Sequence, residues 1–401
     1  MVERKKVLFV SEAVTLAHVV RPAVLASALD SSRYQVEFAS DDRYGFCLEG
    51  RGFTTHRIHS KSPQAFLDVL SKGAPLYSYE ELKDYVMEDR ELLKSVRPDL
   101  VVGDFRLSLA VSAAVEGIPY ASLVNAHWSP YSTQSRFPIP DLPPVRLFGS
   151  RVVGFFFHLV QESVFRQHAK ALNRLRKEYG LEVLPDLRAA YTHGDRVLYL
   201  DVPELVPTGN LPANHRYIGP VQWAPKMDLP NWWDEQPTDR PLVYVTLGSS
   251  GKVDLLPAVL QTLGALPIYG LVATAGRKHI EEVPENMRVV DFLPGDLAAR
   301  RADLVICNGG SATVYQALGE GTPVLGIASN MDQHLTMGCV EKAGAGVLLR
   351  SDEFEGGKFD HAVRRMLDEV QFGAAAERVK VWFLAYPAEA LFTEVVADML
   401  S

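Results

Sequence analysis

The sequence predicts an α/β protein of two doubly wound domains, each with a parallel sheet covered by helices. Three observations predict this class. The chain has 401 residues, more than one ordinary hydrophobic core organises. Strand-like apolar runs alternate with helix-like segments through both halves. A stretch rich in proline, residues 203–237, interrupts the alternation, which then starts again.

The expected elements follow the same alternation in each half. In the first half, strands are expected over 6–11, 34–40, 99–104, 118–126 and 196–203, with helices over 21–30 and 107–117. In the second half, strands are expected over 241–251, 269–276, 287–294, 302–310 and 322–329. We place a first domain at 1–218, a second at 219–380, and a helical segment at 381–401 that packs back on the first. Ligands of such sheets bind beyond the carboxyl ends of the strands, so we expect a site in the cleft between the domains.

Composition narrows the class of protein. The net charge is −8 and the pI about 5.8, which argues against a nucleic acid or an anionic membrane as a general partner. The three cysteines are widely spaced, which suits a reducing compartment. The apolar run near the N-terminus is too short for a signal peptide, and no stretch is long enough to span a bilayer. We therefore expect a cytoplasmic protein, and the sequence leaves its oligomeric state open.

Two glycine-bearing turns suggest a phosphate site in the second domain. One follows the strand that ends at Cys307 and opens a helix, and the other, residues 248–251, includes Ser249. Free backbone N–H groups at a helix start bind anions, and glycines allow a close approach. Either turn alone could be an ordinary strand-to-helix connection, but two on one rim predict a diphosphate site. The candidates in the first turn are Asn308, Gly309, Gly310, Ser311 and Thr313.

A candidate general base lies in the first domain. His18 follows the first expected strand, and Asp104 ends the strand 99–104, so both should reach the same rim of the sheet. A histidine suits proton removal near neutral pH, and a carboxylate would orient its ring. The alternative is that both side chains only cap helices.

Further candidates follow other strands. Asp332 and Gln333 lie one strand beyond the phosphate turn and could hydrogen-bond sugar hydroxyls, although such a pair is often only a solvated turn. His127 and Trp128 could line an acceptor pocket or be buried structural aromatics. No two aspartates are separated by a single residue and the histidines do not cluster, so we expect no metal.

Residues 149–180 form a long amphipathic helical region with apolar and basic faces. It could be the wall of a pocket for a lipophilic acceptor, or a membrane-surface contact. We expect instead that its phenylalanines pack inside the first domain.

The second half resembles the donor signature of family-1 glycosyltransferases, the UDP-glycosyltransferases of the GT-B fold. The matching segments are Phe292-Leu293-Pro294-Gly295, residues 308–313, Gln316, Gly321-Thr322-Pro323 and Asp332-Gln333. The similarity extends more thinly through "TLAHVVRP", "VVGDF", "RYIGPV" and "VYVTLGS". It implies two facing Rossmann-like domains, the first binding an acceptor and the second a nucleotide sugar.

The resemblance also implies an inverting, metal-independent transfer without a cofactor. His18 would take the proton of the acceptor hydroxyl while Asp104 steadies its ring. Phe292 and Leu293 would contact the nucleobase of the donor. The diphosphate would be held by Asn308, Gly310, Thr313 and Ser249. Asp332 and Gln333 would hold the sugar, which we expect to be glucose, carried by UDP rather than dTDP. The acceptor would be a small lipophilic or aromatic molecule with a hydroxyl group.

The sequence departs from the family pattern at several positions. Asn308 replaces a histidine, Gln316 replaces the glutamate that holds the ribose diol, and Gly295 replaces a glutamine. The proline after His18 comes four residues later rather than three. Two alternatives therefore stay open, a nucleotide-sugar epimerase of the same fold and a non-catalytic nucleotide-binding partner of a glycosyltransferase.

Overall fold

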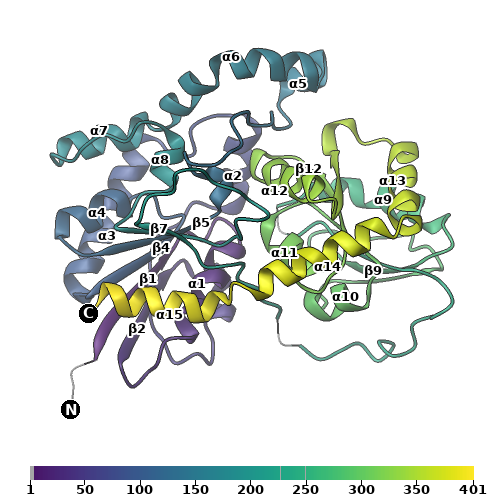
Figure 1. The fold of residues 1–401 in the computed structure, drawn as a ribbon, viewed down its shortest axis with the longest axis horizontal. Coiled ribbons are helices and arrows are strands. Elements are labelled where there is room, and N and C mark those ends of the chain that lie inside the picture. The colour runs from purple at the N-terminus through teal and green to yellow at the C-terminus, as the bar shows by residue number, and fades with distance from the viewer. Residues whose placement is uncertain (1–3, 226, 249) are drawn as a thin grey trace. The chain divides into compact units, whose positions relative to one another are not determined.

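The computed structural model of the chain describes residues 4–225, 227–248 and 250–401. The chain divides into two compact units, whose elements are labelled in Figure 1. The first unit holds the residues up to Phe137, Gly154–Val221 and Tyr386–Ser401, and the second holds Pro138–Val153 and Gln222–Ala385. Each contains one parallel sheet, so the predicted class of two doubly wound α/β domains is confirmed.

The sheet of the first unit has seven parallel strands in the order β3-β2-β1-β4-β5-β6-β7. The order reverses between β1 and β4, and a doubly wound sheet binds ligands at this kind of switch point. The strands are β1 Lys5–Ser11, β2 Tyr34–Ser40, β3 Thr54–Arg57, β4 Leu100–Asp104, β5 Tyr120–Val124, β6 Arg196–Tyr199 and β7 His215–Tyr217.

The second unit repeats this plan with six parallel strands in the order β10-β9-β8-β11-β12-β13. Its switch point lies between β8 and β11, where the two glycine turns begin. The strands are β8 Leu242–Thr246, β9 Tyr269–Ala273, β10 Met287–Val290, β11 Leu304–Cys307, β12 Val324–Ala328 and β13 Gly346–Arg350.

Helices connect the strands of both sheets. In the first unit they are α1 Ala17–Ser27, α2 Pro63–Ser71, α3 Tyr79–Val96, α4 Leu109–Glu116, α7 Lys170–Glu178, α8 Leu187–Tyr191, α15 Ala388–Met399, and α6 Ser150–His168 from Gly154 onward. In the second they are α5 Pro143–Phe148, α9 Leu256–Gly264, α10 Gly295–Arg301, α11 Ser311–Gly319, α12 Met331–Lys342, α13 Gly356–Asp368 and α14 Gln371–Leu384. Short 3₁₀ turns are η1 Asp42–Cys47, η2 Ala126–Trp128, η3 Val253–Leu255 and η4 Ser351–Glu353.

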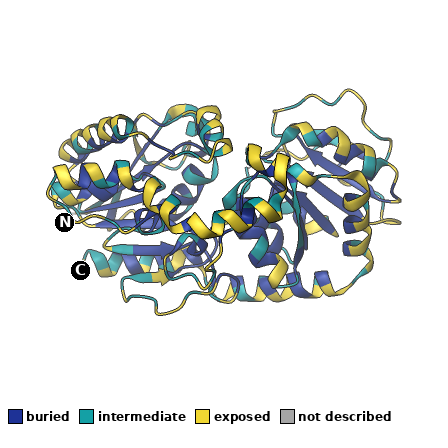
Figure 2. Ribbon diagram, turned by 90° about the horizontal axis from the view of Figure 1, so that it is seen from above, coloured by how far each residue is buried: buried dark blue, intermediate teal, exposed yellow. Residues whose placement is uncertain are grey.

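The cores lie on the faces of the sheets, where the central strands are almost wholly buried (Figure 2). In the first unit, α15 belongs to this core, because Phe392 is fully buried and its ring lies 5.9 Å from that of Phe9. Central parallel strands are covered on both faces, which explains why they read as continuous apolar runs in the sequence. In the described part of the chain, no helix is both long and apolar enough to cross a membrane.

The structure corrects one expectation about the helical region 149–180. We expected its phenylalanines to pack inside the first unit. Phe165 does so, but the side chains of Phe155 and Phe156 are 62% and 61% exposed. The expectation was wrong for these two because the helix is anchored by its opposite face, which holds Gly154, Gln161 and Phe165.

Candidate active site

The predicted base and its orienting carboxylate meet at the switch point of the first unit. Asp104 is the last residue of β4 and pairs in register with Ser11, the last residue of β1. His18 is the second residue of α1, and its Nδ1 lies 2.7 Å from Oδ1 of Asp104. Neither residue caps a helix, since α1 and α4 have Leu16 and Ser108 as N-caps without side-chain bonds. The capping alternative is therefore excluded.

Sequence reasoning missed Arg21, which binds the same carboxylate. Its Nη2 and Nε donate to the two oxygens of Asp104 at 2.8 and 3.1 Å, and its Nη1 donates to Asn125 Oδ1 at 2.9 Å. Asn125 Nδ2 in turn donates to Asp201 at 3.0 Å. Arg21 and Asp104 are almost fully buried, so the guanidinium compensates a carboxylate that would otherwise be isolated in the interior. The sequence carries no direct signal for this contact, because Arg21 and Asp104 are 83 positions apart.

These contacts fix the tautomer of His18. The carboxylate of Asp104 has only acceptor oxygens, so the 2.7 Å contact requires Nδ1 to carry the hydrogen and donate it. The lone pair then lies on Nε2, the nitrogen that could accept a proton from a substrate. Nη2 of Arg21 also lies 3.0 Å from Nδ1, but two hydrogen-bearing nitrogens do not bond, so this contact is only close packing.

Phe105 holds the other side of the histidine ring. Its ring stacks on that of His18, with 4.7 Å between centroids and 10° between planes. The backbone of Phe105 has φ of 60°, a left-handed conformation that is strained for an aromatic residue and that clusters at functional sites. The same ring contacts Phe66 and Tyr191 at 5.9 and 5.3 Å, and Tyr191 contacts Trp128 at 5.2 Å. An aromatic cluster therefore begins at the base.

The two predicted acceptor residues differ in placement. Both lie in η2, directly after β5. His127 is fully buried within the unit, whereas Trp128 is half-buried and joins the aromatic cluster. Of the two, only Trp128 is partly exposed, and the acceptor role of both stays a prediction.

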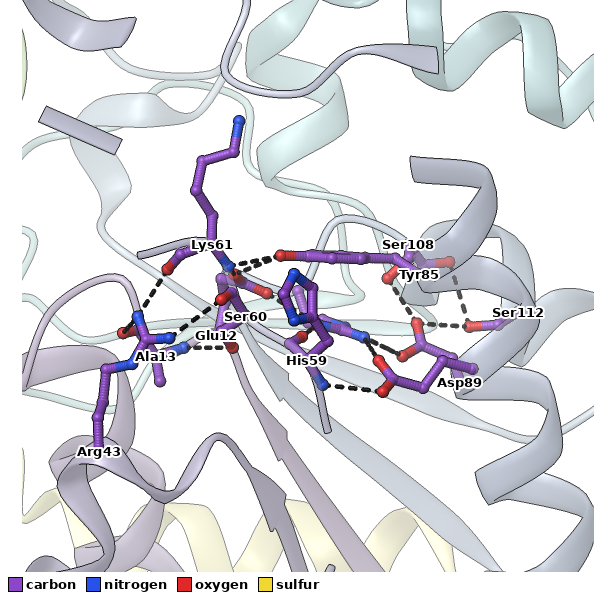
Figure 3. Close-up of polar contacts among 12 residues, drawn as sticks. Glu12, Ala13, Arg43, His59, Ser60, Lys61, Tyr85, Asp89, Ser108 and Ser112 are labelled. Atoms are coloured by element: carbon purple, nitrogen blue, oxygen red, sulfur yellow. Dashed lines mark hydrogen bonds and ion pairs between the residues drawn. The ribbon is translucent and has the colours of Figure 1, made fainter. Parts of the chain in front are cut away.

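A buried ionic network supports the two strand ends (Figure 3). Arg106, two residues after Asp104, is completely buried and pairs with Glu12 at 3.0 Å and with Asp89 of α3 at 2.9 Å. Tyr85 donates to Glu12 at 3.2 Å. Burial raises the pKa of Glu12 and of Asp89 above their usual values, although the charge of Arg106 acts in the opposite direction. The network locks together the segments that follow β1 and β4.

In the second unit, the two glycine turns lie against each other. Asn308 follows β11, and its Nδ2 donates to Ser250 Oγ, in the turn after β8, at 3.1 Å. A Cβ on Gly251 would lie 2.8 Å from Cβ of Asn308, so only glycine allows this approach. Ser249, a predicted phosphate ligand in this turn, lies outside the described residues.

The other predicted phosphate residues form the start of α11. Gly309 has φ of 79°, and a Cβ there would meet Cγ of Met337 at 2.7 Å. Gly310 is the N-cap and provides no side chain, so the first-turn amides are not satisfied by a capping oxygen. Ser311 is buried and Thr313 half-buried in that first turn. This arrangement presents backbone donors and the helix dipole to an anion.

Two of the departures from the family pattern, Gln316 and Gly295, are in direct contact, and each fits the other. The Nε2 of Gln316 donates to the carbonyl of Trp223 at 2.8 Å, which draws its Oε1 over Gly295. A Cβ at position 295 would lie 2.3 Å from that oxygen, so the amide occupies the space that a side chain there would need. Of the predicted base-binding pair, Phe292 is 56% exposed, whereas Leu293 is buried.

Asp332 and Gln333 begin α12. Asp332 is half-buried in the first turn. Gln333 forms a capping box with Asn330, and its Oε1 accepts a bond from the amide of Ser329 at 2.9 Å. The side chain of Gln333 already caps the helix. To contact a sugar as predicted, the same side-chain amide would have to form a further hydrogen bond while keeping its bonds in the cap.

Sequence reasoning also missed Asp141, which lies in the second unit and contacts both α12 and the residue that follows the glycine turn 248–251. Its carboxylate pairs with Lys252 at 2.8 Å, Arg350 at 3.1 Å and His334 at 3.4 Å. Burial opposes the ionisation of Asp141, but hydrogen bonds from His334, Lys252 and Ser351 outweigh it and hold its pKa below the usual value. Lys252, which follows the glycine turn, is thus engaged by a carboxylate. Among the described residues, no group of three metal-ligating side chains is suited to a metal ion.

Comparison with known proteins assigns the family. A "PGL/p-HBAD biosynthesis glycosyltransferase" of Mycobacterium tuberculosis is 50% identical over 377 residues, 94% of this chain and 88% of that protein. A "PGL/p-HBAD biosynthesis rhamnosyltransferase" of Mycobacterium bovis is 49% identical over 94% of this chain and 84% of its own. The chain belongs to this family of glycosyltransferases.

Two further comparisons agree with that assignment. Residues 258–401 match the model of the "Erythromycin biosynthesis protein CIII-like, C-terminal domain". The crystal structure of the kitacinnamycin glycotransferase matches over the full length of both chains with a TM-score of 0.73 at 17% identity, which supports the GT-B fold. The predicted resemblance to family-1-like glycosyltransferases is confirmed. The epimerase and non-catalytic alternatives are set aside, because the relatives that span the chain are named as transferases.

The buried network of the glycosyltransferase yields a stability prediction. Replacing Arg106 with leucine should lower the free energy of unfolding by about 3–5 kcal/mol, because Glu12 and Asp89 would be left as unpaired buried charges. Arg106 acts to lower both carboxyl pKa values, so its removal should raise them further and let the folded variant neutralise these carboxylates by binding protons at low pH. The loss should therefore be smaller at pH 5 than at pH 8 in denaturant titrations.

Arg174→Leu is the matched control, since this exposed arginine pairs with Glu178 at 3.2 Å on the surface. Equal, small losses for both variants would contradict a supporting role of the network.

Proposed function

We propose that the chain transfers a rhamnosyl group from a nucleotide sugar to a hydroxyl group of a lipophilic, aromatic acceptor, with inversion at the anomeric carbon. The observation that carries the proposal is the 2.7 Å contact between Nδ1 of His18 and Asp104 at the switch point of the first unit. A non-catalytic nucleotide-binding protein has no need of an oriented, half-buried imidazole. The name of the Mycobacterium bovis relative supports rhamnose, which replaces the glucose expected from the sequence.

In the proposed reaction, Nε2 of His18 takes the hydrogen of the acceptor hydroxyl. The acceptor oxygen forms a bond to the anomeric carbon while the bond from that carbon to the diphosphate breaks. Asp104 stabilises the imidazolium that results, and Arg21 holds Asp104 in place through two hydrogen bonds. In this proposal, the backbone amides at the start of α11 and the side chain of Asn308 stabilise the negative charge of the departing diphosphate.

The acceptor class rests on the aromatic cluster beside the base. Phe105, Tyr191 and Trp128 follow one another edge to face, starting from the ring that stacks on His18. Such rings favour a flat apolar ligand with a polar end. The relatives' names place those proteins in PGL/p-HBAD biosynthesis, and we propose an acceptor from the same route for this chain.

The donor nucleotide depends on Gln316. A glutamate at this position would offer two oxygens to the two ribose hydroxyls. Gln316 has one acceptor oxygen, Oε1, and its Nε2 already donates to the Trp223 carbonyl. A 2′-deoxyribose has only one free hydroxyl, so we propose dTDP in place of the UDP expected from the sequence.

The first test removes the base. His18→Ala should lower turnover by roughly two to four orders of magnitude, the usual effect of losing a general base. Turnover is measured as nucleoside diphosphate released together with new glycoside, using dTDP-rhamnose and UDP-rhamnose with a panel of phenolic acceptors. His56→Ala is a matched control, because His56 also bonds a carboxylate, Glu37 at 2.6 Å, but on β3. Equal turnover in the two variants would remove His18 from the mechanism.

The second test concerns the nucleotide. Gln316→Glu should shift the ratio of kcat/KM values toward the UDP-sugar and away from the dTDP-sugar. Gln222→Glu controls for the loss of the amide tie, because Nε2 of Gln222 donates to the neighbouring Tyr315 carbonyl at 3.0 Å. An unchanged ratio, or an equal change in both variants, would show that Gln316 does not contact the ribose.

A further inference from the structure

Helix α6 turns its apolar side toward solvent. Val152, Phe155, Phe156 and Leu159 follow one another at spacings that place them on one side of a helix, and Val160 adjoins them. These five side chains are each at least half exposed, and Leu159 reaches 69%. We call them the apolar face of α6. Exposed apolar patches of this kind mark sites of interaction with a partner or a membrane.

Polar side chains attach the opposite side of α6 to the first unit. Oε1 of Gln161 accepts a bond from the amide of Phe137 at 3.0 Å, and its Nε2 donates to the Ser135 carbonyl at 3.1 Å. Nε2 of His158 bonds to the Phe137 carbonyl at 3.0 Å. An ordinary surface helix buries its apolar side and exposes its polar one. In α6 the polarity is reversed for these residues, so the exposed phenylalanines are not a by-product of core packing.

The charge around this helix identifies what covers it. Helices α6 and α7 together carry six arginines and lysines against two glutamates, although the whole chain has a net charge of −8. Four of these cations are exposed, and no described residue forms an ion pair with any of them: Arg151, Arg166, Lys170 and Lys177. Exposed phenylalanine and leucine beside unpaired cations are typical of helices that lie in the interface of an anionic membrane. A soluble protein partner would need an acidic apolar surface, and a bilayer with anionic lipids offers both features at once.

We propose that the apolar face of α6 inserts into the surface of an anionic lipid bilayer, with the basic residues of α6 and α7 contacting lipid phosphates. The helix would lie parallel to the membrane plane. This attachment is independent of the transfer reaction. It would let the first unit meet an acceptor that partitions into the bilayer.

The test is co-sedimentation of the full chain with vesicles. One set contains phosphatidylcholine alone and the other phosphatidylcholine with phosphatidylglycerol. The protein should bind the anionic vesicles more tightly, and added salt should weaken that binding. The triple variant Phe155→Ser, Phe156→Ser, Leu159→Ser should bind more than about tenfold less, because three inserting side chains are lost.

The matched control removes equally exposed apolar side chains elsewhere. Val370→Ser, Val381→Ser and Leu384→Ser, at or in α14, should leave vesicle binding unchanged. Unaltered melting temperatures would show that both triple variants are folded. The proposal is overturned if the unmodified chain stays in the supernatant of both vesicle sets, or if both triple variants bind alike. It is also overturned if light scattering finds a dimer that only the α6 variant dissociates.

Discussion

The proposed chemistry depends on the hydrogen bonds that the carboxylate of Asp104 accepts. It is buried at the end of β4, where it accepts bonds from His18 and from two nitrogens of Arg21. A lone carboxylate in the interior would lose its hydration without any compensating charge or hydrogen bond, which is costly. The guanidinium removes that difficulty. The pair therefore gives His18 a fixed ring orientation and leaves one nitrogen for a substrate.

The same constraint organises both units. In each doubly wound sheet the strand order reverses at one switch point, and the loops that follow the two strands there lead in opposite directions and leave a crevice at the carboxyl ends. The first unit places the proposed proton acceptor, His18, at this point, and the second places two glycine turns joined through Asn308 and Ser250. In the proposed function, one unit carries the acid–base chemistry and the other binds the anion, and the two differ in the loop residues placed on the same kind of fold.

Much of the fold and part of the candidate site could be predicted from the sequence, because those features depend on local sequence patterns. Long apolar runs identified the central strands, and the glycine turn after Cys307 identified the start of α11. The strands β3, β7 and β13 were missed, since they lie at the edges of the sheets, are mostly exposed or half-buried, and lack the continuous burial of the central strands. Contacts between residues far apart in the chain were also missed. Arg21 bonds a residue 83 positions away, and Asp141 bonds one 209 positions away, and no spacing rule reports such pairs.

The prediction that the phenylalanines of helix α6 pack inside the first unit was wrong for a different reason. An amphipathic pattern reports which residues share a side of a helix, but it does not report which side faces the protein. Hydrophobicity normally decides that question, and here hydrogen bonds from Gln161 and His158 decide it instead. An amphipathic helix with unpaired flanking cations therefore deserves both orientations as hypotheses.

The central claim concerns one hydrogen atom. If Asp104 and not Arg21 sets the state of the imidazole, the hydrogen of neutral His18 lies on Nδ1 and the lone pair on Nε2. ¹⁵N-edited NMR of the histidine rings, with His18→Ala to assign the signal, measures this directly. The account predicts the pattern of an Nδ1-protonated, Nε2-unprotonated ring at neutral pH. A ring protonated on Nε2, with Nδ1 accepting a hydrogen from Arg21, would contradict it.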